Sequence, residues 1–263
     1  MVDGLDWTPI TKAIDKGNIE IIKKLIQNGA NPNLYRKSYN SPLNKAILND
    51  KKEIVTLLIQ NDADVNMVDG LKWAPISLAI EKENIDILKI LIDNKADLNL
   101  IDSTDTSQLN NAIRQGNQHI VSLLVERGAD VDLIDNKGWS PISKAISKDK
   151  FEILEILIAH GANPNLLDGA GDSLLSDAVQ KPSLEMASLL VENGANMNTL
   201  DGDGYSPVHK AVKSDDTKII KHFVRNEADV ELKTRDGNNL LEVALKNKKT
   251  NAMKVLLLNK FYS

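Results

Sequence analysis

The sequence is a tandem repeat, and this constrains the fold more than any other feature. A turn-and-helix motif recurs every 33 residues without insertion, starting at Thr8, Ser41, Ala74, Ser107, Ser140, Ser173, Ser206 and Asn239. A second marker keeps the same step, from Asn28-Gly29-Ala30 to Asn226-Glu227-Ala228. Self-similarity at a fixed period of about 20–50 residues is typical of a solenoid. The repeats fill the 263 residues, so the sequence leaves no room for a hidden catalytic domain.

Each unit predicts two short helices. In the first unit Thr8 is a good N-cap, and Pro9 follows at a position where a proline loses no hydrogen bond. Gly17 can adopt the left-handed conformation that ends this helix. A second helix is predicted from about Asn18 to Gln27. Apolar residues at helical spacing form the buried stripe of the first helix, Ile10, Ala13 and Ile14, and the apolar stripe of the second, Ile21, Ile22, Leu25 and Ile26.

One helix pair cannot bury both of its apolar stripes, so the units must stack on each other. A single position of the second helix repeats as Leu25, Leu58, Leu91, Leu124, Leu157, Leu190, Phe223 and Leu256. We therefore predict an all-α repeat solenoid with one continuous core. It is expected to be a single domain, 1–263, with repeats at approximately 1–33, 34–66, 67–99, 100–132, 133–165, 166–198, 199–231 and 232–263, the last a C-terminal cap.

These motifs resemble those of the ankyrin-repeat family. Thr8-Pro9-Ile10-Thr11-Lys12-Ala13 and Ser206-Pro207-Val208-His209-Lys210-Ala211 are similar to the family's T-P-L-H-x-A segment. Asn61-Asp62-Ala63-Asp64-Val65-Asn66 is similar to its G-A-D-V-N segment. The resemblance covers nearly the whole chain. It implies stacked helix-turn-helix pairs with projecting β-hairpin loops, and a concave face of hairpins and first helices that binds a partner protein.

The sequence departs from this pattern between the two helices of a unit. The glycine expected there is replaced by Asp50, Glu83, Asp149, Pro182, Asp215 and Lys248. Glycine adopts positive φ without a steric penalty, so these substitutions are expected to lower stability in the turns while leaving the fold unchanged.

Odd repeats resemble odd repeats, as expected after duplication of a 66-residue block. The residue before the Thr/Ser-Pro turn is aromatic only in odd repeats, as Trp7, Trp73, Trp139 and Tyr205. By resemblance this position faces the concave groove. Two interpretations stay open: each ring packs across its own hairpin, or the rings anchor a partner, since Trp and Tyr dominate interface hot spots. Odd repeats also have a lysine at the end of the first helix, at Lys16, Lys82 and Lys148. These lysines are a weaker candidate set of partner-binding residues.

Composition excludes several other functions. A net charge of −5 argues against nucleic acid as the main partner, because its phosphates attract basic surfaces. The absence of cysteine removes thiolate metal sites and a thiol nucleophile. Neither a signal peptide nor an apolar run long enough to span a membrane is found. We therefore expect no membrane insertion and a cytoplasmic location, in the producing cell or in a host cell if the protein is secreted.

Metal and catalytic motifs are also missing. Asp201-Gly202-Asp203-Gly204 invites a calcium interpretation, but Tyr205 and Val212 stand where that loop needs carboxylates. The loop aspartates are better interpreted as turn formers that accept from their own backbone, at Asp3, Asp69, Asp102, Asp135, Asp168 and Asp201. The four histidines lack metal-ligand spacing, and no P-loop or nucleophile motif is present. We expect no cofactor, no metal and no enzyme activity.

The leading hypothesis is therefore a non-catalytic scaffold that binds a partner protein of unknown identity, and a monomer is favoured. The composition rich in Lys, Asn and Ile suggests an AT-rich genome, and by association a bacterial or viral effector that acts on a host. One alternative is a regulatory or structural ankyrin segment of a larger multidomain protein. Another is a groove that binds a peptide or a small molecule.

Overall fold

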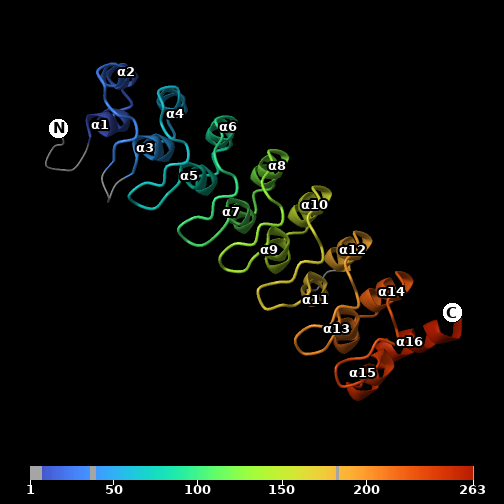
Figure 1. The fold of residues 1–263 in the computed structure, drawn as a ribbon. Coiled ribbons are helices and arrows are strands. Elements are labelled where there is room, and N and C mark those ends of the chain that lie inside the picture. Colours follow the sequence, from blue (N-terminus) through green and yellow to red (C-terminus); the bar gives the residue numbers. More distant parts are fainter. Residues whose placement is uncertain (1–7, 36–39, 182–183, 263) are drawn as a thin grey trace. The chain divides into compact units, whose positions relative to one another are not determined.

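The computed structural model describes residues 8–35, 40–181 and 184–262, and within these ranges the regular structure is helical. The chain divides into two compact units, residues 1–136 and 137–263. In Figure 1 the helices of each unit form two rows. The first helices of successive pairs lie in one row and the second helices in the other. This confirms the predicted all-α repeat architecture.

The unit of residues 1–136 contains four helix pairs. Their bounds are α1 Pro9–Asp15 and α2 Ile19–Gln27, α3 Pro42–Leu48 and α4 Lys52–Ile59, α5 Pro75–Glu81 and α6 Ile85–Asp93, and α7 Gln108–Gln115 and α8 Gln118–Glu126. Each first helix contacts its own second helix, and α3 lies between α1 and α5. The first row is therefore a continuous layer within this unit.

The unit of residues 137–263 has the same organisation. Its helices are α9 Pro141–Ser147 and α10 Phe151–Ala159, α11 Leu174–Val179 and α12 Leu184–Glu192, α13 Pro207–Ser214 and α14 Thr217–Arg225, and α15 Leu240–Lys246 and α16 Thr250–Tyr262. The first helices α9, α11, α13 and α15 contact in sequence, and so do the second helices α10, α12, α14 and α16. Both rows are thus packed layers.

A side-chain cap precedes each first helix except α5, which begins at Pro75 after Ala74 without such a cap. The Thr8 hydroxyl accepts from the Thr11 N–H, and the Ser140 hydroxyl accepts in the same way from Ser143. Where the proline is missing, the cap remains, as at Ser107 before α7. A side-chain acceptor satisfies one of the free N–H groups at a helix start, so the short first helices begin at equivalent positions in successive pairs.

The core follows the repeated apolar positions. Leu58, Leu91 and Leu124 are fully buried in the first unit, as are Leu157, Leu190 and Phe223 in the second. Leu256 is also buried, whereas Leu25 stays half-buried. The column of second-helix leucines is thus confirmed as core at seven of its eight positions. Burying a leucine contributes about 2 kcal/mol, so this column is a main source of stability within each unit.

A column of asparagines also links neighbouring helix pairs. Asn66 Nδ2 donates to the Lys95 carbonyl at 3.2 Å, while Asn66 Oδ1 accepts from the Asp97 N–H at 2.8 Å. Asn165 makes the matching pair of bonds in the second unit, at 2.9 and 2.8 Å. Each amide therefore satisfies backbone groups of the next loop, which fixes the spacing between consecutive pairs.

The turns between paired helices keep their conformation without glycine. Asp50, Glu83, Asp149, Asp215 and Lys248 all have φ between 52° and 61°. The expectation that these substitutions leave the fold unchanged is confirmed at these five positions, and Pro182 lies outside the described residues. Side chains rarely adopt this left-handed region, so these residues retain local strain.

Candidate partner-binding face

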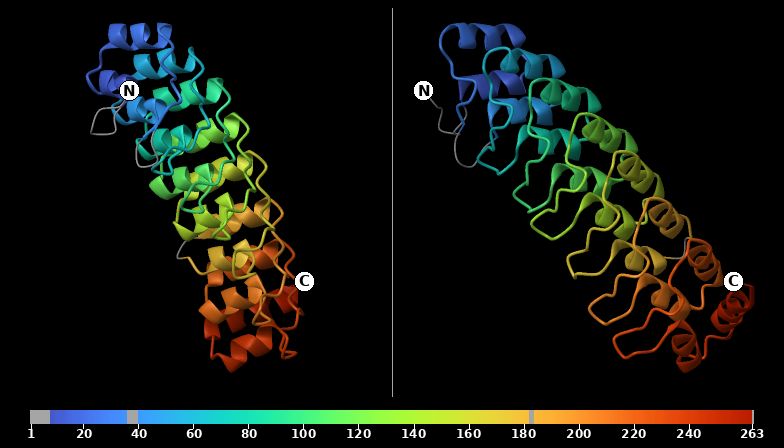
Figure 2. Two further views of the ribbon diagram at one scale, coloured as in Figure 1. Left: turned by 60° about the vertical axis from the view of Figure 1, so that its left-hand side comes forward. Right: turned by 45° about the vertical axis from the view of Figure 1, so that its right-hand side comes forward.

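The loops that precede the first helices project from one side of each unit (Figure 2). Expected as β-hairpins, they contain no regular strand among the described residues. Two isolated antiparallel bridges join Ile101 to Ser107 and Leu167 to Ser173. The loops are closed mainly by turn hydrogen bonds.

An aspartate organises the loops before α5, α7, α11 and α13, and Thr234 Oγ1 takes its place before α15 by accepting from the Asn238 N–H. Asp69 Oδ1 accepts from the N–H groups of Leu71 at 2.9 Å and Trp73 at 3.1 Å, and the Asp69 N–H donates to the Trp73 carbonyl at 3.0 Å. Asp201 makes the equivalent bonds to Asp203 and Tyr205. The predicted turn-forming role is confirmed here and, by the same bonds, at Asp102 and Asp168. Asp3 lies outside the described residues.

These turns hold the aromatic position in place. Trp73, Trp139 and Tyr205 are each half-buried, while Trp7 lies outside the described residues. The Lys144 ammonium lies 4.8 Å from the centroid of the Trp139 ring. The Lys213 ammonium lies 3.9 Å from that of Tyr205. Both distances fall within the range of a cation–π contact, so both rings already accept a cation from a first helix.

The candidate lysines from the sequence are not the lysines that contact the rings. Lys16, Lys82 and Lys148 are exposed residues at the C-caps of α1, α5 and α9. A cation is favourable there because the C-terminal end of a helix has partial negative charge. The lysines above the rings come from other positions, Lys144 and Lys213. The structure therefore joins the aromatic position to lysines that the sequence did not single out.

A groove opens beside Tyr205, and we name it the α11–α13 groove. It has a volume of about 440 Å³. Its lining residues are Asp172, Gln180, Asp201, Asp203, Tyr205, Lys210, Lys213 and Ser214. The Lys210 ammonium lies 2.7 Å from Asp201 Oδ2 and 3.3 Å from Asp172 Oδ2. Lys210 thus connects the loop aspartate of its own helix pair to an acidic residue of the preceding pair.

Asp201 and Lys210 stabilise each other's charge, so the pKa of Asp201 is lowered and that of Lys210 is raised. Burial opposes ionisation of Asp201, but the hydrogen bond from Lys210 and two backbone N–H donors outweigh it and lower its pKa. Burial likewise opposes the charge on Lys210, yet Asp201 and Asp172 raise its pKa. Both groups are therefore charged at neutral pH, and their charges cancel inside the groove.

Asp177 on α11 is compensated only in part, because the charges of Lys210 and Lys181 lower its pKa by less than burial and the neighbouring acids raise it. It is half-buried, and burial together with the charges of Asp168 and Asp172 raises its pKa to about 6. Lys210 occupies the same position one repeat later, and Lys45 on α3 ion-pairs with Asp15 of the preceding pair at 2.8 Å. Asp177 thus stands where these equivalent helices have a lysine, and the aligned repeats show this change. Its effect on the pKa of Asp177 depends on the nearby charges of Asp168 and Asp172.

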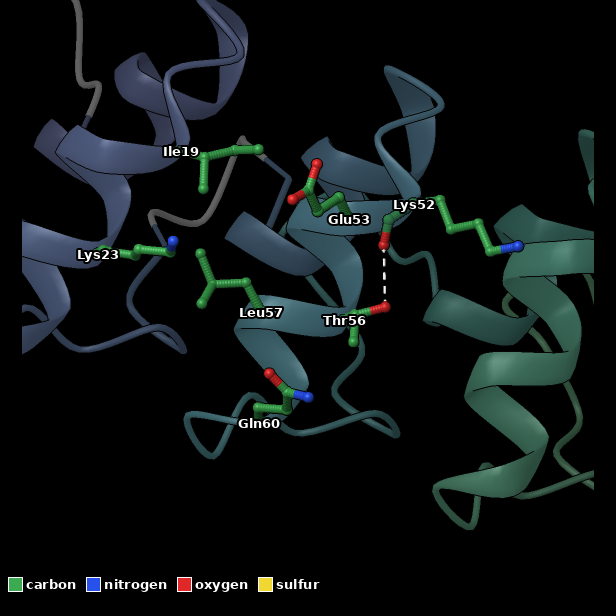
Figure 3. A pocket seen from close by; sticks show the side chains of 7 residues that line it. All are labelled: Ile19, Lys23, Lys52, Glu53, Thr56, Leu57 and Gln60. Atoms are coloured by element: carbon green, nitrogen blue, oxygen red, sulfur yellow. Dashed lines mark hydrogen bonds between the residues drawn. The ribbon is translucent and has the colours of Figure 1, made fainter.

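A second hollow lies on the opposite row, between α2 and α4 (Figure 3). Its volume is about 470 Å³, and its lining residues are Ile19, Lys23, Lys52, Glu53, Thr56, Leu57 and Gln60. In Figure 3 the side chains of Ile19 and Leu57 point into it, and Lys52 extends away. Lys52 pairs with Asp86 of the next pair at 2.8 Å. Ile19 and Leu57 make the centre of this hollow apolar, and its five other lining residues are polar or charged.

Metal-ligand clusters and membrane-spanning helices are both absent from residues 8–35, 40–181 and 184–262. Among these residues no group of three or more histidines and acids could hold a metal ion. In the same residues no helix is both long enough and apolar enough to cross a bilayer. Stacked helix pairs with projecting loops and aromatic rings held at the loop bases define a class, the helical-repeat binding proteins.

Comparison with known families agrees with this class. The family model for ankyrin repeats, described as three copies, matches residues 2–69, 76–168 and 175–262. The chain belongs to the ankyrin-repeat family, whose members are generally protein–protein interaction modules. A comparison with curated proteins returns no match.

Proposed function

We propose that this protein is a non-catalytic scaffold that binds a partner protein on the concave face formed by its loops and first helices. The supporting observation is the aromatic residue at the loop base, as at Trp73, whose backbone N–H and carbonyl are both held by Asp69. Such a ring loses little conformational freedom on binding, and rigid aromatics are frequent hot spots. The proposed anchors are Trp7, Trp73, Trp139 and Tyr205.

The proposal includes how the protein acts. All eight repeats form one binding module, which masks, tethers or inhibits its partner stoichiometrically as a monomer. The lysines Lys16, Lys82 and Lys148 add charge selectivity at the edge of the face, since charges at a rim affect association more than affinity. The proposed location is the cytoplasm, of the producing cell or of a host cell in which the protein serves as an effector.

The test is a double substitution, Trp73→Ala with Trp139→Ala, measured against a partner identified by crosslinking to the full chain. Loss of two hot-spot rings should weaken binding at least about a hundredfold. A matched control replaces Ile19 and Leu57 by alanine in the hollow between α2 and α4. Circular dichroism establishes that both variants remain helical. Unchanged affinity in the tryptophan variant would refute the anchors.

The same control tests the alternative of a groove that binds a peptide or a small molecule. The hollow lined by Ile19 and Leu57 is the observation that favours it, because ligand pockets are concave and largely apolar. If the alanine pair in this hollow abolishes binding while the tryptophan pair does not, the partner occupies the second-helix row. A regulatory or structural segment of a larger protein would bind through either face.

A further inference from the structure

The second unit ends on a face whose apolar stacking positions are uncovered. α15 and α16 are the last helices of their rows (Figure 1), and α15 contacts α13 and α16. One position of the first helices is buried where a further helix pair follows, at Ile146, Val179 and Val212. At the same position of α15, Leu245 is 63% exposed. The stacking surface therefore continues on α15, although no further helix pair covers it among the described residues.

The last helix, α16, adds apolar surface to this face. Leu257 and Leu258 are 38% and 58% exposed. Leu258 stands at the position of Asp93, which pairs with Arg127 of the following helix pair at 2.6 Å, so this position faces a following pair. A hollow of about 40 Å³ is lined by Leu241 of α15 and Leu257 of α16, among others. Exposed apolar patches of this kind mark interaction sites. We name the patch the α15–α16 end face, formed by Leu241, Leu245, Leu257 and Leu258.

The polar positions around this face differ in charge from those of earlier pairs. Asp215 accepts from Asn251 Nδ2 at 3.0 Å and from the Ala252 N–H at 2.7 Å, both in the following pair. Lys248 stands at the same position after α15. An ammonium has no acceptor, so a further helix pair of the same type would find no partner for these donors.

The end of α15 shows a similar reversal. Asp15, at the equivalent position of α1, pairs with Lys45 of the following pair at 2.8 Å. Glu81 of α5 pairs in the same way with Arg114 at 3.1 Å. Lys246 occupies this position in α15. The end face therefore repels the cations that these earlier pairs accept.

Two acids also border the end face, and both are engaged at the start of α15. Glu242 Oε2 accepts from the Asn239 N–H at 2.8 Å, and Glu231 Oε2 accepts from Asn239 Nδ2 at 3.3 Å. The exposed lysines lie at the end of α15, in the following turn and on α16, at Lys246, Lys248 and Lys254. The uncovered leucines thus have a basic border that attracts acidic groups.

This border disfavours a second copy of the chain as the occupant. A copy that stacked through its α1–α2 pair would bring Lys12 to Lys246, because Lys45 meets Asp15 at the equivalent positions. Two end faces in contact would bring their lysines together. Like charges at an interface suppress association, so both arrangements are unfavourable.

We infer that the α15–α16 end face binds an amphipathic helix of a partner protein, with apolar side chains on the leucines and acidic side chains beside the lysines. A helix fits because the equivalent surfaces of earlier pairs pack against helices, and an apolar helix face in an apolar groove is a common mode of recognition. This surface goes beyond the proposed function, because it includes none of the aromatic anchors.

The probe is a phage-displayed library of helical peptides, selected on the full chain. Each peptide has about eighteen residues, since shorter isolated helices are marginal, with leucines along one face and Glu or Lys at each flanking position. Binders should contain Glu at least about tenfold more often than Lys at these positions. Lys246→Glu with Lys254→Glu should reverse this preference. The matched control, Lys24→Glu with Lys89→Glu, changes exposed lysines of α2 and α6 and should leave it unchanged.

The leucines are tested with a selected acidic peptide. Its affinity should fall at least about tenfold in Leu245→Glu with Leu258→Glu, because the new charges lie in the apolar contact and repel the peptide's acids. Both leucines are exposed, so circular dichroism should show unchanged helix content. Ile21→Glu, at an exposed isoleucine of α2, is the control and should change affinity by less than about twofold.

The inference is overturned by a selection without binders, by binders with no preference for Glu, or by equal effects of Ile21→Glu and the leucine pair. A dimer of the full chain in sedimentation equilibrium that dissociates in Leu245→Glu would also overturn it, because a second copy would then cover the face. Trp73→Ala with Trp139→Ala should bind the acidic peptide as the wild type does. The end face and the aromatic anchors can therefore fail independently.

Discussion

Asn44 and Asp69 are 25 residues apart in the sequence, yet Asn44 Nδ2 donates to Asp69 Oδ2 at 2.8 Å in the interior of the first unit. The same carboxylate oxygen also accepts from Asn40 Nδ2 at 3.0 Å and from the Ser41 N–H at 3.3 Å. Its other oxygen holds the loop before Trp73. One buried carboxylate therefore connects the start of α3 to the loop that presents an aromatic ring.

Replacing Asp69 by alanine should lower the free energy of unfolding by about 3 kcal/mol. The change leaves several buried donors without an acceptor, and hydrogen bonds to charged groups are the stronger ones. Urea unfolding followed by circular dichroism measures the loss. Asp93→Ala is the control, because its ion pair with Arg127 is on the surface, and such pairs contribute less than about 1 kcal/mol. A loss in Asp69→Ala no larger than the control would contradict the proposed role.

Asp177 predicts an unusual pH dependence. Its folded-state pKa of about 6 exceeds the ordinary value of 3.8. Its contribution to stability is therefore fully present below pH 3.8 and is lost as the pH rises through about 6. Asp177→Asn removes this loss, so the variant should be more stable than the wild type at pH 7.5 by about 1 kcal/mol, after allowing for solvent screening of a half-buried group.

Comparing the wild type with Asp177→Asn at two pH values isolates the contribution of Asp177 to the free energy of unfolding. Burial lowers the pKa of His209, whose contribution is lost as the pH falls and so acts in the opposite direction. His209 is present in both proteins, so its effect cancels in the difference. Urea midpoints at pH 7.5 and at about pH 3.5 should differ clearly at the higher value and converge at the lower, which lies below the unfolded pKa of Asp177. A difference in urea midpoint between the two proteins that does not change with pH would contradict the raised pKa of Asp177.

The left-handed turns predict that glycine stabilises selected positions. Asp149 has a φ of 55°. Asp149→Gly should raise stability by about 0.5–1 kcal/mol, because glycine adopts this region without the steric cost. Asp50→Gly, at a φ of 53°, should gain less, since the Asp50 carboxylate accepts a short hydrogen bond from Asn84. Thermal unfolding of both variants tests this order, and a larger gain at Asp50 would refute it.

The sequence predicted much of the fold because its information is local. The proline and serine caps, the apolar stripes and the aspartate turns each depend on residues a few positions apart, and the structure confirms them at Thr8, Leu58 and Asp69. The aromatic position was predicted as well, although whether its rings anchor a partner stays a prediction. The lysines above Trp139 and Tyr205 were missed, because cation–π contacts depend on how each loop lies over its helix.

The sequence by itself determined the 33-residue period, the helix pairs and the turns, since all of these arise from interactions within one repeat. Only the tertiary structure decided which charges meet. Lys210 reaches Asp172, 38 residues earlier. At Asp177, burial and the charges of Asp168 and Asp172 outweigh those of Lys210 and Lys181 and raise its pKa. The physical reason is that a periodic pattern specifies equivalent positions, but the energy of a charge depends on burial and on neighbours contributed by the adjacent helix pair.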